Sequence, residues 1–363
     1  MKRRIALHRN SVNLIWKLII LVFGSIFWIT SIRNQAYLSD YHGAVSIRYK
    51  EPVLTSQEID HIIQGMVSKE DRNIPEVTLW QRDEDMILTN EERNTSVSVG
   101  LITVVGDMTK VYPNSMLYGG YLSRGDASGC VIDKNTAYQL FHSENAVGLT
   151  INLEHKEYTI SGIMRDMSSN IMIVQEENQA FSKNEGKSYS CMELAFSDTE
   201  NAKYLAENFI RSNGLGTPTV YIDGYMYQKL SYLLIHIPLW FSAMLLILYF
   251  ARRVNKLKGS VVLFVGGWLG IILFSALLIR ITNVHIYYSS SMLPTLWSDF
   301  EFWGNQWKLL KSSLNHIEGS ILYYNDIMLI KRMGLVLSGV ALTVLSQVLG
   351  IKINYIAKKA ASY

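Results

Sequence analysis

The sequence predicts a membrane protein with four transmembrane α-helices and an α+β extracytoplasmic domain between the first and second helices. Four stretches are apolar over the roughly 20 residues that a helix needs to cross a bilayer. Most acidic residues lie between the first two stretches, at 33–228. In that region, segments with the alternation of strands are interspersed with segments of helical periodicity. A long polar region of mixed pattern between two spans indicates a folded domain outside the bilayer.

The apolar stretches predict where the chain crosses the membrane. They are Val12–Ile32, Leu230–Phe250, Val261–Ile279 and Met333–Ile351. With flanking residues they predict transmembrane helices at 12–32, 229–251, 261–280 and 331–352. The first stretch follows a basic N-terminus, as in a signal peptide, but it is long and aromatic and "ITSIRNQA" is a poor cleavage site. We therefore expect it to remain as an anchor.

Basic residues predict the orientation, because loops rich in Lys and Arg stay on the cytoplasmic side. They cluster in the N-terminus 1–11, the loop 252–260 and the tail 353–363. We therefore expect both termini in the cytoplasm, with residues 33–228 and the loop 281–330 outside. Lys331 and Arg332, at the outer end of the last span, depart from this rule.

The region 33–228 is acidic, with 27 acidic and 16 basic residues and a net charge of −11, whereas the whole chain carries +3. The basic excess accompanies the apolar stretches, so it indicates membrane topology and not nucleic acid binding. Cys130 and Cys191 both lie in this acidic region. They either pair as a disulfide or lie apart as buried thiols.

Two β-α-β units flank the middle of the predicted domain. Near its start the order is strand "GAVSIRY", helix "SQEIDHIIQGMVSK" and strand "EVTLWQRDE". Near its end the order is strand "CMELAFS", helix "DTENAKYLAENFIRSNG" and strand "PTVYID". Two such units predict a ferredoxin-like split βαβ sandwich, with the β-rich middle section as an insertion.

The middle section carries a resemblance to a known family. Its sequence is "LYGGYLSRGDASGCVIDKNTAYQLFHSENAVGLTINLEHKEYTISGIM". It resembles the extracytoplasmic core domain of MacB-type ABC transporter permeases, and one span before the domain with three after it resembles the MacB/FtsX-like architecture. The positions that match the family motifs are Gly120, Ser123, Asp126, Leu140, Phe141, Gly148, Gly162 and Ile163.

The resemblance implies the permease subunit of a transporter that exports or extrudes a substrate. It implies a dimer of permeases and separate ATPase subunits that use the ATP. The loop 252–260 is then the expected ATPase contact, through Arg252, Arg253, Lys256 and Lys258. In this chain "NEGKSYS" lacks the first glycine of a phosphate-binding loop, so we expect no nucleotide site, and no metal-ligand spacing is present.

Two further patterns concern helix packing and the outer loop. Gly266 and Gly270 have the small-xxx-small spacing of closely packed transmembrane helices, between protomers or within one bundle. Residues 296–314 place Leu, Phe and Trp on one face, which predicts an amphipathic helix that contacts membrane lipids or packs under the domain.

Two other functions remain as alternatives. One is a membrane-anchored extracytoplasmic binding or sensor protein that needs no ATPase. The remote one is a signal-peptidase-like protease, because "SSSMLPT" and "MLIKRMG" resemble the serine and lysine boxes of those enzymes, with Ser291 and Lys331 as the pair. The span directly after Lys331 leaves no chain to build the β-rich protease fold.

Overall fold

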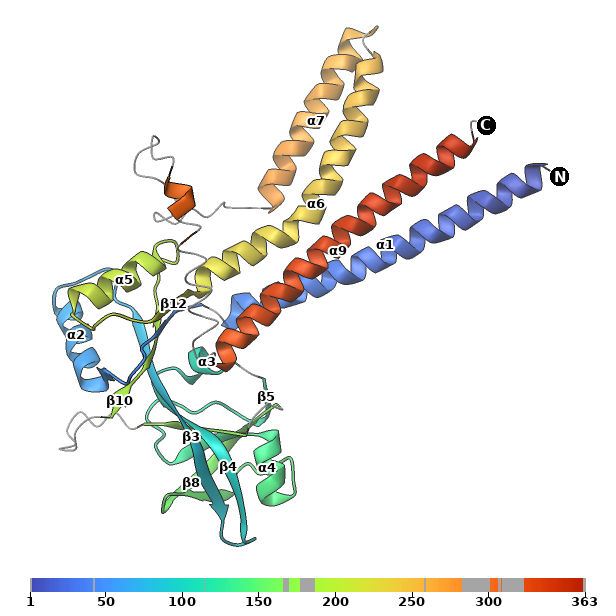
Figure 1. Ribbon diagram of the computed structural model, residues 1–363. Helices are drawn as coiled ribbons and strands as arrows, with labels where there is room; N and C mark the ends of the chain where they lie inside the picture. The colour runs from blue at the N-terminus through green and yellow to red at the C-terminus, as the bar shows by residue number, and fades with distance from the viewer. Residues whose placement is uncertain are drawn as a thin grey trace. The chain divides into compact units, whose positions relative to one another are not determined.

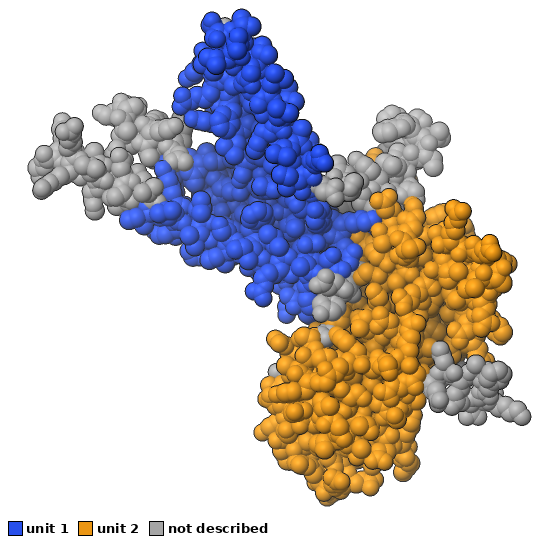
Figure 2. Space-filling view, turned by 180° about the vertical axis from the view of Figure 1, so that it is seen from behind, with its two compact units in different colours: residues 1–40, 226–287, 328–363 blue, residues 41–225, 288–327 orange. Residues whose placement is uncertain are grey.

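The computed structural model contains two compact units (Figure 2). The helical unit comprises residues 1–40, 226–287 and 328–363, and the α/β unit comprises residues 41–225 and 288–327. The structure describes residues 2–41, 43–113, 115–165, 170–176, 187–257, 259–282, 301–305, 308 and 323–361.

One part of the α/β unit, formed by the two ends of its sequence, contains the two predicted β-α-β units (Figure 1). They are β1 (Val45–Arg48), α2 (Ser56–Ser68) and β3 (Glu76–Asn90), then β11 (Cys191–Ala195), α5 (Ala202–Ser212) and β12 (Val220–Asp223). The strands lie in the order β12-β1-β11-β3, with each neighbouring pair antiparallel. Apolar faces of α2 and α5 pack on these strands in one buried cluster. A small separate sheet pairs β2 (Leu54–Thr55) with β10 (Ser188–Tyr189).

The other part of the α/β unit, formed by the middle of its sequence, is a closed ring of strands. It contains β4 (Thr95–Val105), β5 (Met116–Gly119), β6 (Gly129–Asp133), β7 (Thr150–Leu153), β8 (Lys156–Met164) and β9 (Ile171–Gln175). Strand pairing runs from β3 through β4, β9, β6, β8 and β7 back to β3, and β5 extends from β8. Alternate residues of these strands point inward and form a second core with α4 (Lys134–Phe141).

The predicted ferredoxin-like sandwich with a separate β-rich insertion is not confirmed, because the middle section is not separate from the flanking strands. All strands except β2 and β10 belong to one ten-stranded sheet. The long strand β3 is shared, because its first part, from Glu76 to Trp80, pairs with β11 and the stretch from Leu79 to Asn90 pairs with β4. The middle section is therefore a barrel-like continuation of the same sheet. Local patterning predicts strands but not which distant strand pairs with which.

The helical unit contains four helices long and apolar enough to cross a membrane. They are α1 (Lys2–Tyr41), α6 (Gly224–Val254), α7 (Val261–Thr282) and α9 (Tyr324–Ala361), with a short 3₁₀ helix η1 (Asn255–Leu257) after α6. α6 and α9 begin in the α/β unit and continue into the helical unit. α9 begins at Tyr324, so the residues directly before the predicted span 331–352 are helical as well.

Small residues bring α1 and α9 close together. A Cβ atom at Gly24 would lie 2.2 Å from Ser346 Oγ, and one at Gly339 would lie 2.2 Å from Ser31 Oγ. Ser31 also donates a hydrogen bond to the carbonyl of Val336. These side chains let the two helices approach as closely as their backbones allow.

Candidate coupling site

The segment Tyr323–Asp326, where α9 begins, is anchored in the α/β unit by every one of its four residues. The chain passes from the α/β unit to the helical unit between Ile327 and Met328, so this anchored turn is continuous with the long apolar helix. We call these four residues the anchor segment. Its contacts with the rest of the α/β unit form one connected cluster of polar and aromatic side chains.

Asp326 of the anchor segment joins a buried ion cluster. Arg48 on β1 donates to Glu193 on β11 over 2.7 Å and forms an ion pair with Asp326 over 3.3 Å. Ser46 and the indole of Trp80 also donate to Glu193. All of these side chains are at least nine-tenths buried. A buried charge cluster of this kind holds its partners in one geometry, since separating them leaves charges without solvation.

Tyr323 continues the cluster through its ring. It meets the ring of Trp80 edge to face at 4.6 Å, and the guanidinium of Arg48 lies 4.9 Å from the centre of the Trp80 ring. Its backbone N–H donates to the Asp326 carboxylate, which closes the first turn of α9. This is the arrangement of a capping box, in which the side chain at the third helical position caps the residue before the helix.

The remaining two residues of the anchor segment bind the loop after β4. The ring of Tyr324 stacks on Tyr112 at 4.4 Å between centres. The side-chain amide of Asn325 donates to the carbonyl of Lys110 over 3.1 Å. Lys110 lies in α3 (Met108–Val111), and Tyr112 directly follows it. The Asp107 carboxylate caps the start of this helix. The anchor segment therefore touches β1, β3, β11 and α3 together.

Burial and charge oppose each other in this cluster. Burial raises the pKa of Glu193, and the nearby Arg48 guanidinium offsets part of that effect. Burial by itself would lower the pKa of Arg48, but the carboxylates of Glu193 and Asp326 outweigh it and raise the pKa. Burial also raises the pKa of Tyr323 to about 12. The cluster is stable while Arg48 keeps both carboxylates, since removing one partner of a buried pair is costly.

Sequence reasoning did not find this cluster. Arg48 and Glu193 each lie in a strand of otherwise apolar residues, "VSIR" and "CMELA", and a charge at a buried strand position was the available signal. Asp326 precedes the apolar stretch of α9 and was assigned to the outer loop 281–330. Only strand pairing and the path of the chain bring the three residues together.

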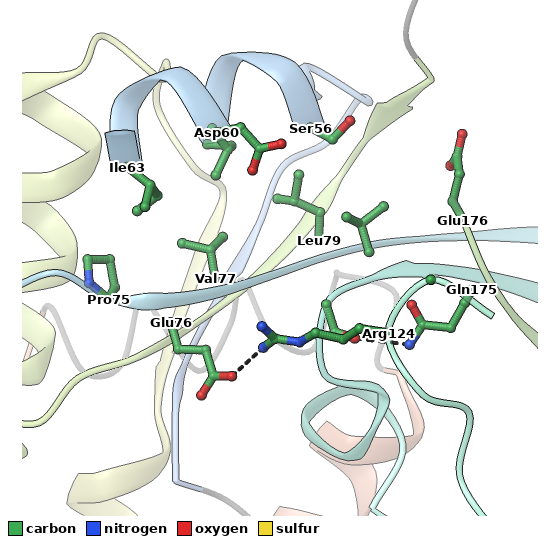
Figure 3. A pocket seen from close by; sticks show the side chains of 14 residues that line it. Ser56, Asp60, Ile63, Pro75, Glu76, Val77, Leu79, Arg124, Gln175 and Glu176 are labelled. Atoms are coloured by element: carbon green, nitrogen blue, oxygen red, sulfur yellow. Dashed lines mark hydrogen bonds and ion pairs between the residues drawn. The ribbon is translucent and has the colours of Figure 1, made fainter. Parts of the chain in front are cut away.

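A pocket of about 250 Å³ lies elsewhere in the α/β unit (Figure 3). Its apolar floor comes from α2 and β3, with Ile63, Val77 and Leu79 among the lining side chains. At its rim Arg124 forms an ion pair with Glu76 (Figure 3). Among the described residues, its lining contains Ser56 but no histidine or lysine.

The positions that carried the family resemblance are structural. Asp126 accepts a hydrogen bond from the Gly129 backbone, and Gly148 begins the hairpin with a positive φ of 85°. A Cβ atom at Gly162 would lie 2.3 Å from the carbonyl oxygen of Gly120, where β5 meets β8. Ser123 accepts the Asp126 backbone N–H, so the turn closes on itself. Leu140, Phe141 and Ile163 are buried in the barrel core.

The model of the MacB-like periplasmic core domain matches residues 19–209, more than half of the chain. The chain belongs to the MacB-like family of ABC transporter permeases. With its four apolar helices, the permease is a multi-pass membrane protein.

Three solved structures are similar to the permease over the same domain. The periplasmic region of MacB from Actinobacillus actinomycetemcomitans is 17% identical with a TM-score of 0.38, covering 47% of this chain and 85% of that one. The extracellular domain of the noncanonic ABC-type transporter YknZ from Gram-positive bacteria is 14% identical with a TM-score of 0.36, covering 47% and 94%. A domain of a putative permease protein from Porphyromonas gingivalis is 12% identical with a TM-score of 0.35, covering 48% and 84%. A comparison with curated proteins found no match.

The predicted ATPase-contact residues lie at the end of α6 and in η1 of the permease. Arg252, Arg253 and Lys256 are exposed, and the Arg253 guanidinium lies 5.5 Å from the Tyr249 ring centre. Lys258 lies outside the described residues. Arg252 and Arg253 at the end of α6 and Lys256 in η1 make this end of α6 basic and exposed, and we call these three residues the basic turn.

The other predicted residues are distributed as follows. Nothing described lies within 4 Å of a Cβ atom built at Gly266 or Gly270, whereas one at Gly267 would meet Val254. Lys331 is exposed on α9, while Ser291 lies outside the described residues. Most of the predicted helix 296–314 also lies outside them, although 302–305 are helical.

Cys130 and Cys191 are free, buried thiols that belong to different cores. Burial raises the pKa of both. The thiol of Cys191 lies close enough to Tyr323 of the anchor segment for the two groups to affect each other's pKa. Of the two possibilities that the sequence left open, the structure has the separate thiols.

Proposed function

We propose that the permease couples ATP hydrolysis by a separate ATPase subunit to work done by its extracytoplasmic α/β domain, such as export or extrusion of a substrate. In this proposal both termini and the loop 252–260 are cytoplasmic. The chain would act with a second permease protomer, identical or not, and would bind no cofactor itself. Family membership supports the permease role, and the anchor segment supports the mechanism.

The anchor segment offers a direct mechanical route. α9 is continuous from Tyr324 to Ala361, so its two ends cannot move independently without bending or breaking its hydrogen bonds. The ion pair between Arg48 and Asp326 and the stacking of Tyr324 on Tyr112 fix the outer end of that helix to the domain. A shift of α9 when the ATPase subunits close would therefore displace β1, β11 and α3.

α6 adds a second route. It begins at Gly224, directly after β12, and the Gly224 N–H donates to the carbonyl of Ala44 beside β1. β12 and β1 are paired over their full lengths. The start of α6 and the anchor segment thus both act on β1. The basic turn at the other end of α6 is the contact we propose for the ATPase.

The test is a pull-down of the tagged full-length permease in mild detergent, with ATP hydrolysis measured on the eluate. We expect an ABC ATPase to co-purify, and Arg252→Glu with Arg253→Glu to release it, since reversed charges would face its acidic surface. The matched control is Arg252→Lys with Arg253→Lys, which keeps the charge and should keep the ATPase.

The alternatives give different results in the same experiment. Purification of the protein alone and inactive in several detergents would contradict the transporter proposal and favour an anchored sensor. Processing of a reporter signal peptide that is lost in Ser291→Ala would favour the protease. Release of the ATPase by both double variants would contradict a role for charge in the contact.

A further inference from the structure

Basic residues stand at one end of each apolar stretch of the permease, the end that faces the proposed extracytoplasmic side. Arg33 follows the first stretch, Arg280 follows the third, and Lys331 with Arg332 precede the fourth. Lys229 takes the corresponding place before the second. The general bias places excess Lys and Arg on the cytoplasmic side. This second set of cations therefore calls for its own physical reason.

Arg332 makes defined contacts with α1 within the helical unit. Its Nη1 donates to Oδ1 of Asn34 on α1 over 2.8 Å. Its guanidinium carbon lies 4.2 Å from the centre of the Tyr37 ring, also on α1. Asn34 is buried, and its own amide group donates to the carbonyl of Thr30. Arg332 is thus held against α1 in a defined position.

The partners of Arg332 are neutral, so its charge is not balanced. Among the described residues, no carboxylate forms an ion pair with Arg33, Lys331 or Arg332. The Nε atom of Arg332 is buried and has no acceptor in the described part of the chain. A positioned guanidinium with donors to spare matches phosphate oxygens, which it binds with two parallel hydrogen bonds.

The surroundings favour a phosphate that carries acyl chains. Arg33 and Arg332 each stand at the end of an apolar stretch, at the level where headgroups meet hydrocarbon. One to two turns deeper, the large apolar side chains of Ile29 on α1 and Leu337 on α9 are exposed in the chain. A lipid can place its phosphate on the cations and its chains on this apolar surface, whereas free phosphate uses only the first.

We propose that Arg332, with Lys331 and Arg33, binds the phosphate of an anionic lipid headgroup at the extracytoplasmic end of α1 and α9. The orientation is that of the proposed function, but the site itself depends only on the helical unit. Arg332 provides the bidentate contact, and Lys331 and Arg33 add charge from exposed positions. The bound lipid would stabilise the pairing of α1 with α9 a few residues after the anchor segment.

The test measures lipid binding to the purified full-length permease by native mass spectrometry, with phosphatidylglycerol and phosphatidylcholine as the probes. We expect phosphatidylglycerol to bind more tightly. In Lys331→Gln with Arg332→Gln its affinity should fall roughly 30-fold, for the loss of two charges near a headgroup. Lys352→Gln, which removes an exposed charge further along α9, is the matched control and should change the affinity only slightly.

Three results would overturn the proposal. The first is equal affinity of the double variant and the wild type for phosphatidylglycerol. The second is a loss of affinity in Lys352→Gln as large as in the double variant. The third is complete displacement of the lipid by inorganic phosphate, which would identify a free anion as the ligand. Arg332→Lys should lose part of the affinity, since it keeps the charge without the fork. If Arg332→Gln does not fold, Lys331→Gln alone should still lower the affinity several-fold, and no change there would contradict the site. ATPase co-purification is measured separately, so failure of the lipid site and failure of the transporter proposal remain distinct.

Discussion

Replacing Asp326 with Asn tests the anchor segment most directly. The change keeps the shape of the side chain and an oxygen to accept from the Tyr323 backbone, but it removes the charge that faces Arg48 over 3.3 Å. Breaking a buried ion pair costs about 3–5 kcal/mol when one charge is left alone. Arg48 keeps its ion pair with Glu193 at 2.7 Å, so the loss should be smaller. We expect the free energy that holds the anchor segment in place to fall by about 2–3 kcal/mol.

Cys191 supplies the assay. Its thiol is buried in the cluster against which Tyr323 and Tyr324 pack, so we expect a maleimide reagent to reach it when the anchor segment leaves. If opening is fast relative to labelling, a loss of 2–3 kcal/mol raises the labelling rate roughly 30- to 160-fold. Cys130, buried in the barrel core, is the internal control and should remain slow.

Two outcomes would refute this reasoning. Unchanged labelling of Cys191 in Asp326→Asn would show that the ion pair does not hold the segment. An equal increase at Cys130 would show that the variant destabilises the whole α/β unit. Glu193→Gln with Asp326→Asn completes a double-mutant cycle. Because both carboxylates share Arg48, their effects on the opening free energy should not add.

Two further predictions concern the barrel and the alkaline limit of the anchor segment. Gly162→Ala would place a Cβ atom 2.3 Å from the Gly120 carbonyl oxygen. It should lower the free energy of unfolding, measured by denaturant titration, by about 1–3 kcal/mol. The control Gly120→Ala adds a Cβ atom with nothing within 4 Å and should be nearly neutral in the same titration. Equal effects would contradict the steric argument. The pKa of Tyr323 is raised to about 12 by burial, so the folded state holds this proton more firmly than the unfolded state and stability falls as pH rises from about 10 to 12. Tyr323→Phe removes this contribution, and thermal melts across that range should show a shallower decline than the wild type; an identical slope would count against it.

Much of the local structure of the permease follows from its sequence. The apolar stretches predict helices because a buried backbone in hydrocarbon must satisfy its own hydrogen bonds. The segments "SQEIDHIIQGMVSK" and "DTENAKYLAENFIRSNG" carry helical periodicity, and both are helices in the structure, at Ser56–Ser68 and Ala202–Ser212. Two glycines of the family motif in the middle section have local reasons, because Gly162 serves a close approach of β5 to β8 and Gly148 has a positive φ.

The anchor segment is different, because its position depends on contacts between distant parts of the chain. Glu193 becomes a partner of Arg48 only when β11 pairs with β1, and Asp326 joins them from a segment more than a hundred residues away. The neutral partners of Arg332 likewise come from α1 at the other end of the sequence. The sequence alone determined which segments are helices, strands and spans, since these depend on periodicity within a few residues. Only the tertiary structure decided which buried charges meet, because strand register and helix packing are properties of the whole chain.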